Sequence, residues 1–436
     1  MFCQLEILRH CLPSSVRRFL EELPESLDET YERVLREIKK PNRDHARRLL
    51  QCLVVAIRPL RVEELAEIVA VNFDDAEGIP KLNPSWRWED QEQALLTSCS
   101  SLITIVDTGR SRVVQFSHFS VKEFLTSARL ATSAQDVSCY NIVLAPAHTI
   151  LAQSCLSTLL RLDNPVEDSS VEKRSPLAGY AAEHWVRHAQ FEDVASRIKG
   201  IKYLFDLDKP YFAAWRQLHD IDTRPSRPSV LYLFTSDSKS GATPLYYAAL
   251  CGFPNLVERL IAKHPQHVNA IGGYYLTPAV AALAGRHFDL ARVLRDNGSS
   301  LEPRGDIGWS PLHSAVCRED LEMIQVLLDY GVDVNSQTDG GSTPLLFVMW
   351  SNSKNPDLRV ARLLLDHGAD PNLRTQTGET PMHRASKYGR IEIARLLIER
   401  GASVDVQDEQ GRTPLDVASG EQRDEIMKLL LEHCAK

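Results

Sequence analysis

One short pattern decides the fold, and it reads Thr380-Pro381-Met382-His383-Arg384-Ala385 in one copy and Ser310-Pro311-Leu312-His313-Ser314-Ala315 in another. Proline suits the first turn of a helix because its missing N–H would be unpaired there, and the hydroxyl before it can accept hydrogen bonds from the free N–H groups. Each pair therefore predicts the start of a helix. The Ser/Thr-Pro pair recurs six times at spacings of 33 to 37 residues, with its hydroxyl residue at Thr243, Thr277, Ser310, Thr343, Thr380 and Thr413.

A second helix follows each start. Its apolar residues recur at i, i+3 and i+4, the period of a helix that buries one face. Four of these helices run into Gly298, Gly331, Gly368 and Gly401, where glycine can adopt the left-handed conformation that ends a helix. The apolar positions are Val257, Leu260, Ile261; Leu290, Val293, Leu294; Met323, Val326, Leu327; Val360, Leu363, Leu364; Ile393, Leu396, Leu397; and Ile426, Leu429, Leu430.

The six units resemble ankyrin repeats, whose Thr-Pro-Leu-His-x-Ala signature matches the two hexapeptides quoted above. Such units stack on their neighbours, because one helix pair cannot bury its apolar face alone. The chain departs from the pattern at Pro265, which replaces a glycine, at Val280 and Leu346, which replace the histidine, and at the insertion Asn352 to Asp357. We interpret His313 and His383 as residues that stabilise the turn, rather than as catalytic residues or metal ligands.

The resemblance implies a surface for a protein partner, because partners of ankyrin proteins usually dock on the turn tips and on the exposed side of the first helices. The aromatic residues near the insertion, with Trp350 at their centre, are the candidates for the strongest anchors. The alternative is that Trp350 packs under the inserted loop and matters only for stability. The expected residues at the turn tips are Tyr274, Asp306, Trp309, Asp339, Gln376, Glu379, Glu409 and Arg412. Those on the first helices are Tyr247, Phe347, Trp350, Arg384 and Lys387.

The N-terminal half predicts helices followed by a β-hairpin. Ser26 and Glu29 form a capping box before a helix over residues 27–39, and a second helix begins near Asn42. A third helix carries Leu65, Ile68 and Val69. Two apolar runs, 102–106 and 112–116, flank a polar turn and predict the hairpin. This order of elements suggests a winged helix.

Residues 1–190 resemble the region just after the nucleotide-binding core of fungal NACHT-ankyrin proteins, a family of signalling NTPases. In such NTPases a histidine of the winged helix can sense the nucleotide, which implies this role for His118; a hydrogen bond at the entry of a helix is the alternative. The resemblance rests on Leu27-Asp28-Glu29-Thr30-Tyr31-Glu32-Arg33-Val34-Leu35, Arg58-Pro59-Leu60-Arg61-Val62-Glu63-Glu64-Leu65, His118-Phe119-Ser120-Val121-Lys122-Glu123-Phe124-Leu125 and Tyr180-Ala181-Ala182-Glu183-His184-Trp185.

No enzymatic motif stands out. A P-loop needs Gly-Lys-Ser or Gly-Lys-Thr to hold phosphates, and neither tripeptide occurs in the 436 residues. The Gly-x-Ser-x-Gly motif of hydrolases is also missing. His184 and His188 could share a metal ion, but no third ligand at a suitable spacing accompanies them. We therefore expect no catalysis, no cofactor and no metal, and a function as a scaffold or recognition module. The alternative is the regulatory part of a NACHT-type NTPase whose ATPase core is missing from this chain.

Charge and composition limit the partners and the compartment. The net charge of −8 disfavours nucleic acid, and the helix around residues 61–71 carries Glu63, Glu64 and Glu67, which would repel phosphate. The nine cysteines include no Cys-x-x-Cys pair and read as reduced thiols. No apolar run is long enough to span a membrane, and no signal peptide is evident. We expect a cytoplasmic or nuclear protein.

The predicted fold class is mostly α, a winged-helix-like domain followed by a solenoid of six ankyrin repeats. The predicted domains are 1–130, a helical and winged-helix-like adaptor; 131–235, a helical linker or capping region; and 236–436, the repeat array. Within the middle region we expect linkers at 130–174 and 220–240, rich in Ser, Asp, Pro and Thr, and a degenerate helix pair at 175–204. The last helix should cap the C-terminal end.

Overall fold

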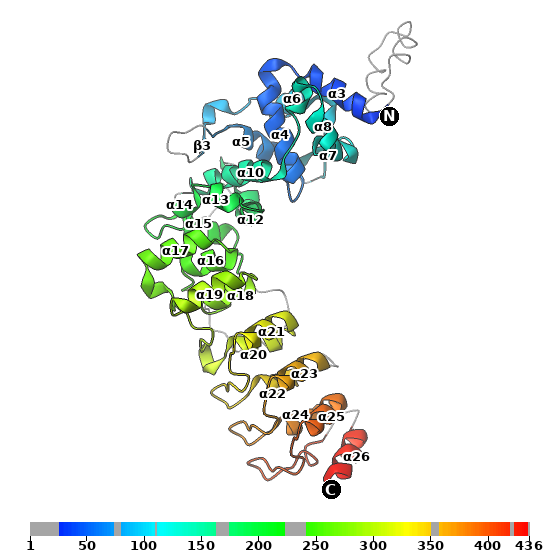
Figure 1. Cartoon of the computed structure of the whole chain (residues 1–436), viewed down its shortest axis with the longest axis vertical. Coiled ribbons are helices and arrows are strands. Elements are labelled where there is room, and N and C mark those ends of the chain that lie inside the picture. Colours follow the sequence, from blue (N-terminus) through cyan, green and yellow to red (C-terminus); the bar gives the residue numbers. More distant parts are fainter. Residues whose placement is uncertain are drawn as a thin grey trace. The chain divides into compact units, whose positions relative to one another are not determined.

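The computed structural model describes residues 26–73, 80–109, 111–162, 174–222, 241–349, 357–418 and 423–434. Contacts divide the chain into two compact parts, 1–221 and 222–436. The chain is mostly helical, and no helix among the described residues is long and apolar enough to cross a membrane (Figure 1).

Three helices open the N-terminal part as predicted. The Ser26 hydroxyl caps the first of them by accepting a hydrogen bond from the Glu29 N–H at 3.3 Å. Apolar residues such as Leu49 and Leu65 lie fully buried between them. The elements here are α3 (Leu27–Glu37), η2 (Lys40–Asn42), α4 (Arg43–Val55), α5 (Val62–Val69), η3 (Pro84–Trp86), α6 (Gln91–Cys99) and η4 (Ser100–Leu102).

The predicted hairpin is confirmed. Strand β4 (Ile103–Asp107) pairs antiparallel with β5 (Arg112–Phe116), with Ile105 opposite Val114. Strand β1 (Leu60–Arg61) pairs with the other edge of β5, so the sheet order is β1-β5-β4. A second small sheet joins β2 (Val71–Asn72) to β3 (Lys81–Leu82). Helices with a hairpin after them make the winged helix.

A long buried helix follows, where we expected a linker. Helix α10 (Leu144–Leu159) packs against both α4 and α12. Its Ser and Thr residues misled the prediction, because their hydroxyls bond back to the helix itself: Ser154 donates to the Ile150 carbonyl at 2.9 Å and Thr158 to the Ser154 carbonyl at 3.1 Å. The linker expectation for 130–174 was therefore wrong within the described residues, while 163–173 and most of 220–240 lie outside them. The division of this half at residue 130 stays a prediction.

Short helices complete the N-terminal part around an aromatic core. Trp185 and Trp215 are fully buried, with ring centroids 5.3 Å apart. The expected helix pair at 175–204 is present as α12 with the two short helices after it, and its role as a cap for the array stays a prediction. The elements are α7 (Phe119–Leu125), α8 (Ala128–Thr132), α9 (Gln135–Ser138), α12 (Ala178–Ala189), α13 (Val194–Arg197), α14 (Ile201–Leu204) and α15 (Tyr211–Leu218).

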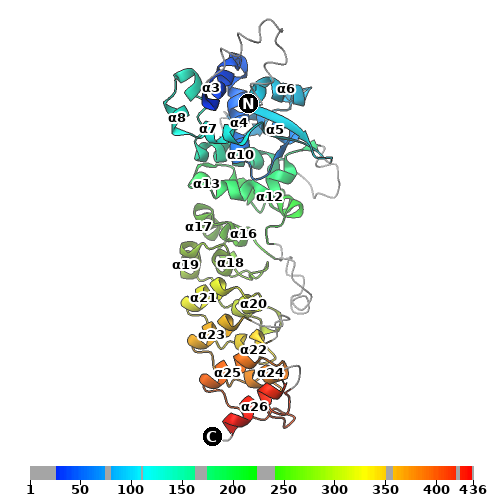
Figure 2. The same cartoon turned by 90° about the vertical axis from the view of Figure 1, so that its right-hand side faces the viewer.

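The C-terminal part is a stack of helix pairs, which follow one another in chain order (Figure 2). Five pairs are complete. In the sixth repeat the predicted first helix is only a helical turn at Pro414–Val417, followed by α26 (Arg423–Cys434). The pairs are α16 (Pro244–Cys251) and α17 (Pro254–Lys263); α18 (Pro278–Ala284) and α19 (Phe288–Asp296); α20 (Pro311–Cys317) and α21 (Leu321–Asp329); α22 (Pro344–Val348) and α23 (Leu358–Asp366); and α24 (Pro381–Lys387) and α25 (Ile391–Glu399). Two short helices, η6 (Pro265–His267) and η7 (Asp306–Gly308), lie between the pairs.

The predicted caps are present with one exception. The hydroxyls of Thr243, Ser310, Thr343 and Thr380 accept a hydrogen bond from the N–H three residues later. In the second repeat the Thr277 hydroxyl instead donates to the Ser300 carbonyl at 2.8 Å. The glycines after the second helices, Gly298, Gly331, Gly368 and Gly401, all have φ between 80° and 91°. The left-handed helix ends predicted from the sequence are therefore confirmed.

An asparagine ladder joins successive repeats. Asn335 donates from its side chain to the Gly368 carbonyl at 3.1 Å and accepts from the Asp370 N–H at 2.8 Å. Asn269 and Asn372 make the same two bonds to the next repeat. Glu302 holds this position in the third repeat, and its carboxylate only accepts, from the Asp333 N–H. The ladder between the third and fourth repeats therefore has one hydrogen bond where the asparagines make two.

Candidate protein-interaction surface

The turn before the first helix is a small hairpin in the second to sixth repeats. In the fourth repeat the Thr338 N–H donates to the Ser342 carbonyl at 3.0 Å, and in the fifth the Thr375 N–H donates to the Glu379 carbonyl at 2.9 Å. Glycine is needed at the tip: Gly341 has φ +75°, and a Cβ there would lie 2.9 Å from the Gln376 backbone nitrogen. The chain folds this way because only glycine allows both the conformation and the close approach.

These turns bind to each other through the backbone. The Asp339 N–H donates to the Ile307 carbonyl at 2.9 Å, the Gln376 N–H to Gly340 at 3.0 Å and the Glu409 N–H to Thr377 at 3.1 Å. The turns of the third to sixth repeats are therefore joined in series. We call the side formed by the turn tips and the first helices the inner face.

The two signature histidines stabilise their turns, as predicted, and each also contacts the next turn. Nδ1 of His313 accepts a hydrogen bond from the Ser310 N–H at 3.3 Å, and its Nε2 lies 3.0 Å from the Ser342 carbonyl of the next turn. A carbonyl can only accept, so Nε2 carries the hydrogen. His383 repeats this arrangement with Thr380 and the Arg412 carbonyl. Burial lowers the pKa of His313 to about 4, so that it is neutral at physiological pH.

The turn tips present most of the polar residues that we expected there. Asp339, Gln376, Glu409 and Arg412 are exposed, and Tyr274 is half-buried. The side chain of Asp306 lies outside the described ones. Although Arg412 is exposed, it is held in place by Asp408, whose carboxylate accepts from its Nε at 2.9 Å.

Two of the predicted polar residues bind each other. Nε of Arg384 lies 3.3 Å from the Glu379 carboxylate, and the arginine also donates to the Ser342 hydroxyl at 3.4 Å in the preceding repeat. The Arg384 side chain is only 11% exposed. On the same helix, Lys387 is exposed. Lys387 is thus open to a partner, while Arg384 mainly joins two repeats.

Three of the predicted aromatic anchors are buried, which corrects the expectation that they are exposed. Trp309 and Phe347 are 5% and 6% exposed, with ring centroids 4.7 Å apart, and Nε1 of Trp309 donates to the Ser314 hydroxyl at 2.6 Å. Tyr247 is also buried, with its ring 5.4 Å from that of Tyr246. These rings fill space between neighbouring elements. Trp350, the strongest candidate from the sequence, lies outside the described residues.

Other residues of the inner face were missed. Tyr388 at the end of α24 is 47% exposed, and Arg318 at the end of α20 lies over two tyrosine rings. Both stand eight residues after the Ser or Thr of their repeat, so the repeat register could have identified them.

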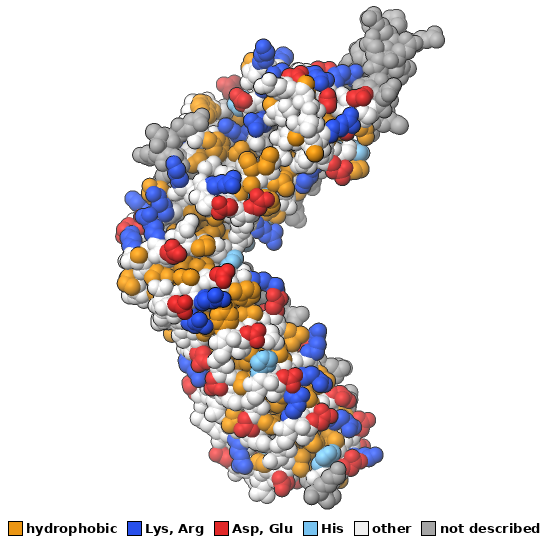
Figure 3. Space-filling model, viewed as in Figure 1, with side chains coloured by type: hydrophobic (Ala, Val, Ile, Leu, Met, Phe, Trp, Pro, Cys, Tyr) orange, Lys and Arg blue, Asp and Glu red, His pale blue; other side chains and the backbone are white. Residues whose placement is uncertain are grey.

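Two acidic residues of the candidate DNA-reading helix lie in the interior of the N-terminal part. Helix α5, the candidate from the sequence, has Glu64 and Glu67 almost fully buried. Burial alone would raise the pKa of Glu64, but the hydrogen bonds from Arg58 and from the Arg61 N–H outweigh it and hold that pKa below its usual value. Figure 3 shows basic and acidic side chains interspersed on the face that it displays.

Two of the three histidines singled out in this part, His118 and His188, have hydrogen-bond partners, whereas Nε2 of His184 is buried without one among the described residues. His118 caps α7, since its Nδ1 accepts from the Ser120 N–H at 3.3 Å, which confirms the helix-entry hydrogen bond. His188 lies between His148, 2.8 Å away, and the Tyr180 hydroxyl at 2.9 Å. Burial lowers the pKa of His188 to about 3. Within the described ranges, no three His, Cys, Asp or Glu side chains are grouped as metal ligands.

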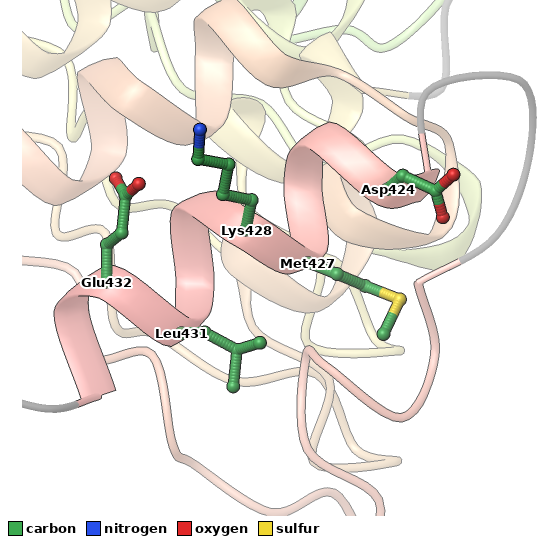
Figure 4. A pocket seen from close by; sticks show the side chains of 5 residues that line it. All are labelled: Asp424, Met427, Lys428, Leu431 and Glu432. Atoms are coloured by element: carbon green, nitrogen blue, oxygen red, sulfur yellow. The ribbon is translucent and has the colours of Figure 1, made fainter.

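The last helix is a partial cap. Helix α26 carries Met427 and Leu431 on one side, among the charged residues Asp424, Lys428 and Glu432 (Figure 4). Leu431 is 53% exposed, whereas Ile391 and Ala394, on the side of α25 that packs against α26, are buried. The charged residues support the expected capping role, although two apolar side chains remain on that side.

Comparison with known proteins supports both parts. Residues 31–135 match the family described as "GPI inositol-deacylase, winged helix domain". Residues 245–338, 279–375 and 346–436 match the family described as "Ankyrin repeats (3 copies)". The chain is thus a mostly helical protein with a winged helix and ankyrin repeats, two kinds of module that are typically non-catalytic.

Several curated relatives share parts of the chain. The "Azaphilone pigments biosynthesis cluster protein L" of Monascus ruber is 33% identical over 299 residues, which cover 65% of this chain and 61% of that protein. The "Ankyrin repeat and SAM domain-containing protein 6" of Mus musculus is 28% identical over 28% of this chain and 14% of its own length. The "Ankyrin repeat protein nuc-2" of Neurospora crassa is 26% identical over 25% of this chain and 11% of its own length. The matched regions thus span less than two thirds of these relatives.

Proposed function

We propose that the chain is a non-catalytic recognition module that binds another protein through the inner face of its repeat array. The main support for this proposal is the series of hydrogen-bonded turns from the third to the sixth repeat. Their backbones are fixed by each other, while Asp339, Gln376 and Glu409 are exposed at the tips. A surface whose backbone is already held in place loses less entropy on binding.

A crosslinking experiment tests the surface. A photo-crosslinking amino acid replaces Lys387 on the inner face in one variant of the full chain, and Arg395 on the second helix of the same repeat in the other; both positions are exposed. We expect a discrete adduct from position 387 in extracts of the source cells, and none from position 395. Equal adducts from both positions, or none from either, would count against the proposal.

The winged helix supports a second proposal, that the N-terminal half is the regulatory part of a NACHT-type signalling NTPase whose ATPase core is missing from this chain. His118 would then stand where such proteins sense nucleotide. In this structure its ring is engaged in capping α7. Equilibrium binding of labelled ATP to the purified chain tests the first proposal. Micromolar affinity that depends on magnesium would contradict the non-catalytic recognition module.

Both proposals imply a protein that works inside the cell, in the cytoplasm or the nucleus. Free thiols support this compartment, since Cys52, Cys99 and Cys155 are buried and unpaired. Imaging of the tagged full chain tests it, and secretion into the medium would contradict it.

A further inference from the structure

A groove lies on the N-terminal part, along helix α6 and beside the start of α4, which packs against it. Its volume is about 380 Å³, within the range of roughly 300 to 1,000 Å³ that is usual for ligand sites. Asp90, just before α6, lines one end, and Thr97 lies about 10 Å further along, since a helix rises about 1.5 Å per residue. Every residue that lines the groove belongs to the N-terminal part.

Two aromatic side chains form part of the wall. The rings of His45 and Trp88 have centroids 6.1 Å apart and planes at 67° to each other, an edge-to-face arrangement. The imidazole therefore covers at most one face of the indole, and Trp88 is half-buried. The face of an indole attracts cations more strongly than that of any other aromatic side chain. The wall thus suits a positively charged group.

The polar groups of the groove accept hydrogen bonds more readily than they donate them. Oδ1 of Asp90 accepts from the Gln93 N–H at 3.0 Å, which fixes the carboxylate, and its other oxygen has no hydrogen bond within the described residues. Thr97 donates its only hydroxyl hydrogen to the Gln93 carbonyl at 2.6 Å, so its oxygen can only accept from a ligand. Ser98 is 5% exposed, and its hydroxyl makes no hydrogen bond in the part of the chain that the structure describes. A ligand with several N–H donors would satisfy these atoms.

The charge of the lining is negative. Asp90 is its only Asp, Glu, Lys or Arg side chain within the described ranges. Two of the basic residues next to the lining in sequence, Arg43 and Arg87, and one of the acidic residues, Glu92, are bound to other groups. Asp90 therefore sets the sign of the charge in the groove, which is complementary to a cation. The charged sequence neighbours of the lining residues balance, with three of each sign: Lys40, Arg43, Arg87, Asp44, Glu89 and Glu92.

We propose that this groove binds an arginine side chain of a partner protein. The guanidinium stacks on Trp88 and donates to the unbonded carboxylate oxygen of Asp90. The N–H groups of the adjoining backbone donate to the hydroxyl oxygens of Thr97 and Ser98. Arginine suits the groove better than lysine, because its planar guanidinium stacks on aromatic rings and is more weakly hydrated than an ammonium group. This goes beyond the proposed function, because it adds a contact outside the repeat array.

Fluorine NMR of the full chain tests the site. The protein is labelled with fluorotryptophan, and the signals of Trp86 and Trp88 are assigned from their loss in Trp86→Phe and Trp88→Phe. Three peptides are titrated in turn: acetyl-Gly-Arg-Gly-amide, the same peptide with lysine, and the same peptide with citrulline, which keeps most of the shape of arginine and loses its charge.

We expect the Trp88 signal to shift with the arginine peptide, to need a higher concentration of the lysine peptide, and to stay in place with the citrulline peptide. Trp86 is 47% exposed and stands two residues away, but it does not line the groove. Its signal should therefore stay in place with all three peptides.

Asp90→Asn should lower the affinity for the arginine peptide by about 3-fold to 10-fold, because it removes the charge from a pair that stays partly in water. Asparagine caps a helix as well as aspartate does, so α6 should remain intact. Glu89→Gln is the matched control, since Glu89 is exposed, stands next to Asp90 and does not line the groove. It should change the affinity by less than about 2-fold.

Three results would overturn the site: equal shifts of Trp88 with the arginine and citrulline peptides, no shift with any peptide, or equal losses of affinity in Asp90→Asn and Glu89→Gln. Equal losses would mean that the peptide is attracted only by the general charge of the surface. The proposed function is judged separately, by the adduct at position 387.

Discussion

The two parts of the chain bury polar groups in different ways. In the N-terminal part a single carboxylate, that of Glu64, accepts hydrogen bonds from Arg58 at 2.7 Å, from the Arg61 side chain at 3.0 Å and from the Arg61 N–H at 2.8 Å. In the array the buried polar groups are small and repeated, as with His313 and His383 in the same register.

This difference indicates which contacts the stability of each part depends on. One network joins the winged helix to the segment before α12, because Arg61 also donates to the Pro176 carbonyl at 3.0 Å and Glu67 accepts from the Leu177 N–H at 3.0 Å. The carboxylates of Glu64 and Glu67 thus help to join elements that are over 100 residues apart in sequence. In the array each repeat depends mainly on its neighbours, so the free energy of unfolding is close to a sum of local terms.

The largest effect should follow from breaking the network of the N-terminal part. We expect Glu64→Gln to lower the free energy of unfolding at pH 7 by about 2 to 3 kcal/mol, because charged hydrogen bonds are lost and a buried site is left poorly matched. The folded-state pKa of Glu64 is lowered, so its stabilisation is present above the unfolded pKa and is lost as the pH falls through the folded one. Urea unfolding at pH 7 measures the change.

Glu63→Gln is the matched control for that experiment, since Glu63 stands next to it on α5 and is half-buried. It should change the free energy of unfolding by less than about 0.5 kcal/mol. Equal effects of the two substitutions would contradict the role of the network.

A loss of similar size is expected at a single turn of the array. An alanine at position 341 would have a positive φ and a Cβ close to the backbone of the next turn. A Cβ at position 331 would also stand at a positive φ but has no neighbour within 4 Å. The positive φ alone costs about 1 to 2 kcal/mol for alanine. We expect Gly341→Ala to cost about 1 kcal/mol more than Gly331→Ala, because the neighbouring backbone must move. Thermal unfolding of both variants measures the difference, and equal melting temperatures would show that contact between turns adds no stability.

The histidine link should cost less and should depend on pH. His313→Leu copies the fourth repeat, where Leu346 stands at this position. We expect a loss of about 1.5 kcal/mol at pH 7.5, because the variant loses the hydrogen bonds to the Ser310 N–H and to the Ser342 carbonyl, which keeps only its bond from the Thr338 N–H. The folded-state pKa of His313 is about 4, below the value of about 6.5 in unfolded chains. The unfolded chain therefore binds more protons between these values, and the wild type loses stability as the pH falls from 6.5 toward 4.

The variant lacks this titrating group, so the difference between it and the wild type should shrink as the pH falls. Urea unfolding at pH 7.5, 6.5, 5.5 and 4.5 follows it. A difference that stays constant over this range would mean that His313 is not held neutral by burial.

The repeats could be predicted from the sequence because their signals are local. The caps at Ser310 and Thr380 and the glycines after four of the second helices depend on a few neighbouring residues. The same holds for the hairpin of the winged helix. Helix α10 was missed because hydroxyl residues can serve a helix as well as a turn: Ser154 and Thr158 bond within it. Whether such a segment forms a helix or a turn depends on its burial, and this segment is buried against two other helices.

The candidate surface could be predicted only in part. The register placed Asp339, Gln376 and Lys387 correctly on the inner face, because it fixes where a backbone position lies. It could not show that Trp309 and Phe347 cover each other, since their rings come from neighbouring repeats. The setting of Arg318 depends in the same way on tyrosines in another repeat. Contacts between repeats decide which side chains remain exposed.

The smallest effect should be a gain, at the rung of the asparagine ladder that has one hydrogen bond. Glu302 accepts from the Asp333 N–H but has no N–H to offer the Gly331 carbonyl, whereas Asn335 makes both bonds one repeat later. Glu302→Asn adds the missing donor and removes a negative charge near Asp333. Because the ladder is exposed, we expect only about 0.5 kcal/mol of added stability, or ~1 to 2 °C in melting temperature.

Asn335→Ala should lower the melting temperature by a similar or somewhat larger amount, because it removes both bonds at an intact rung. Differential scanning calorimetry of the two variants and the wild type at one protein concentration measures both shifts. A lower melting temperature for Glu302→Asn would mean that the charge of Glu302 contributes more to stability at this position than the second hydrogen bond does. The stability of the array would then depend on more than the repeated backbone links between neighbours.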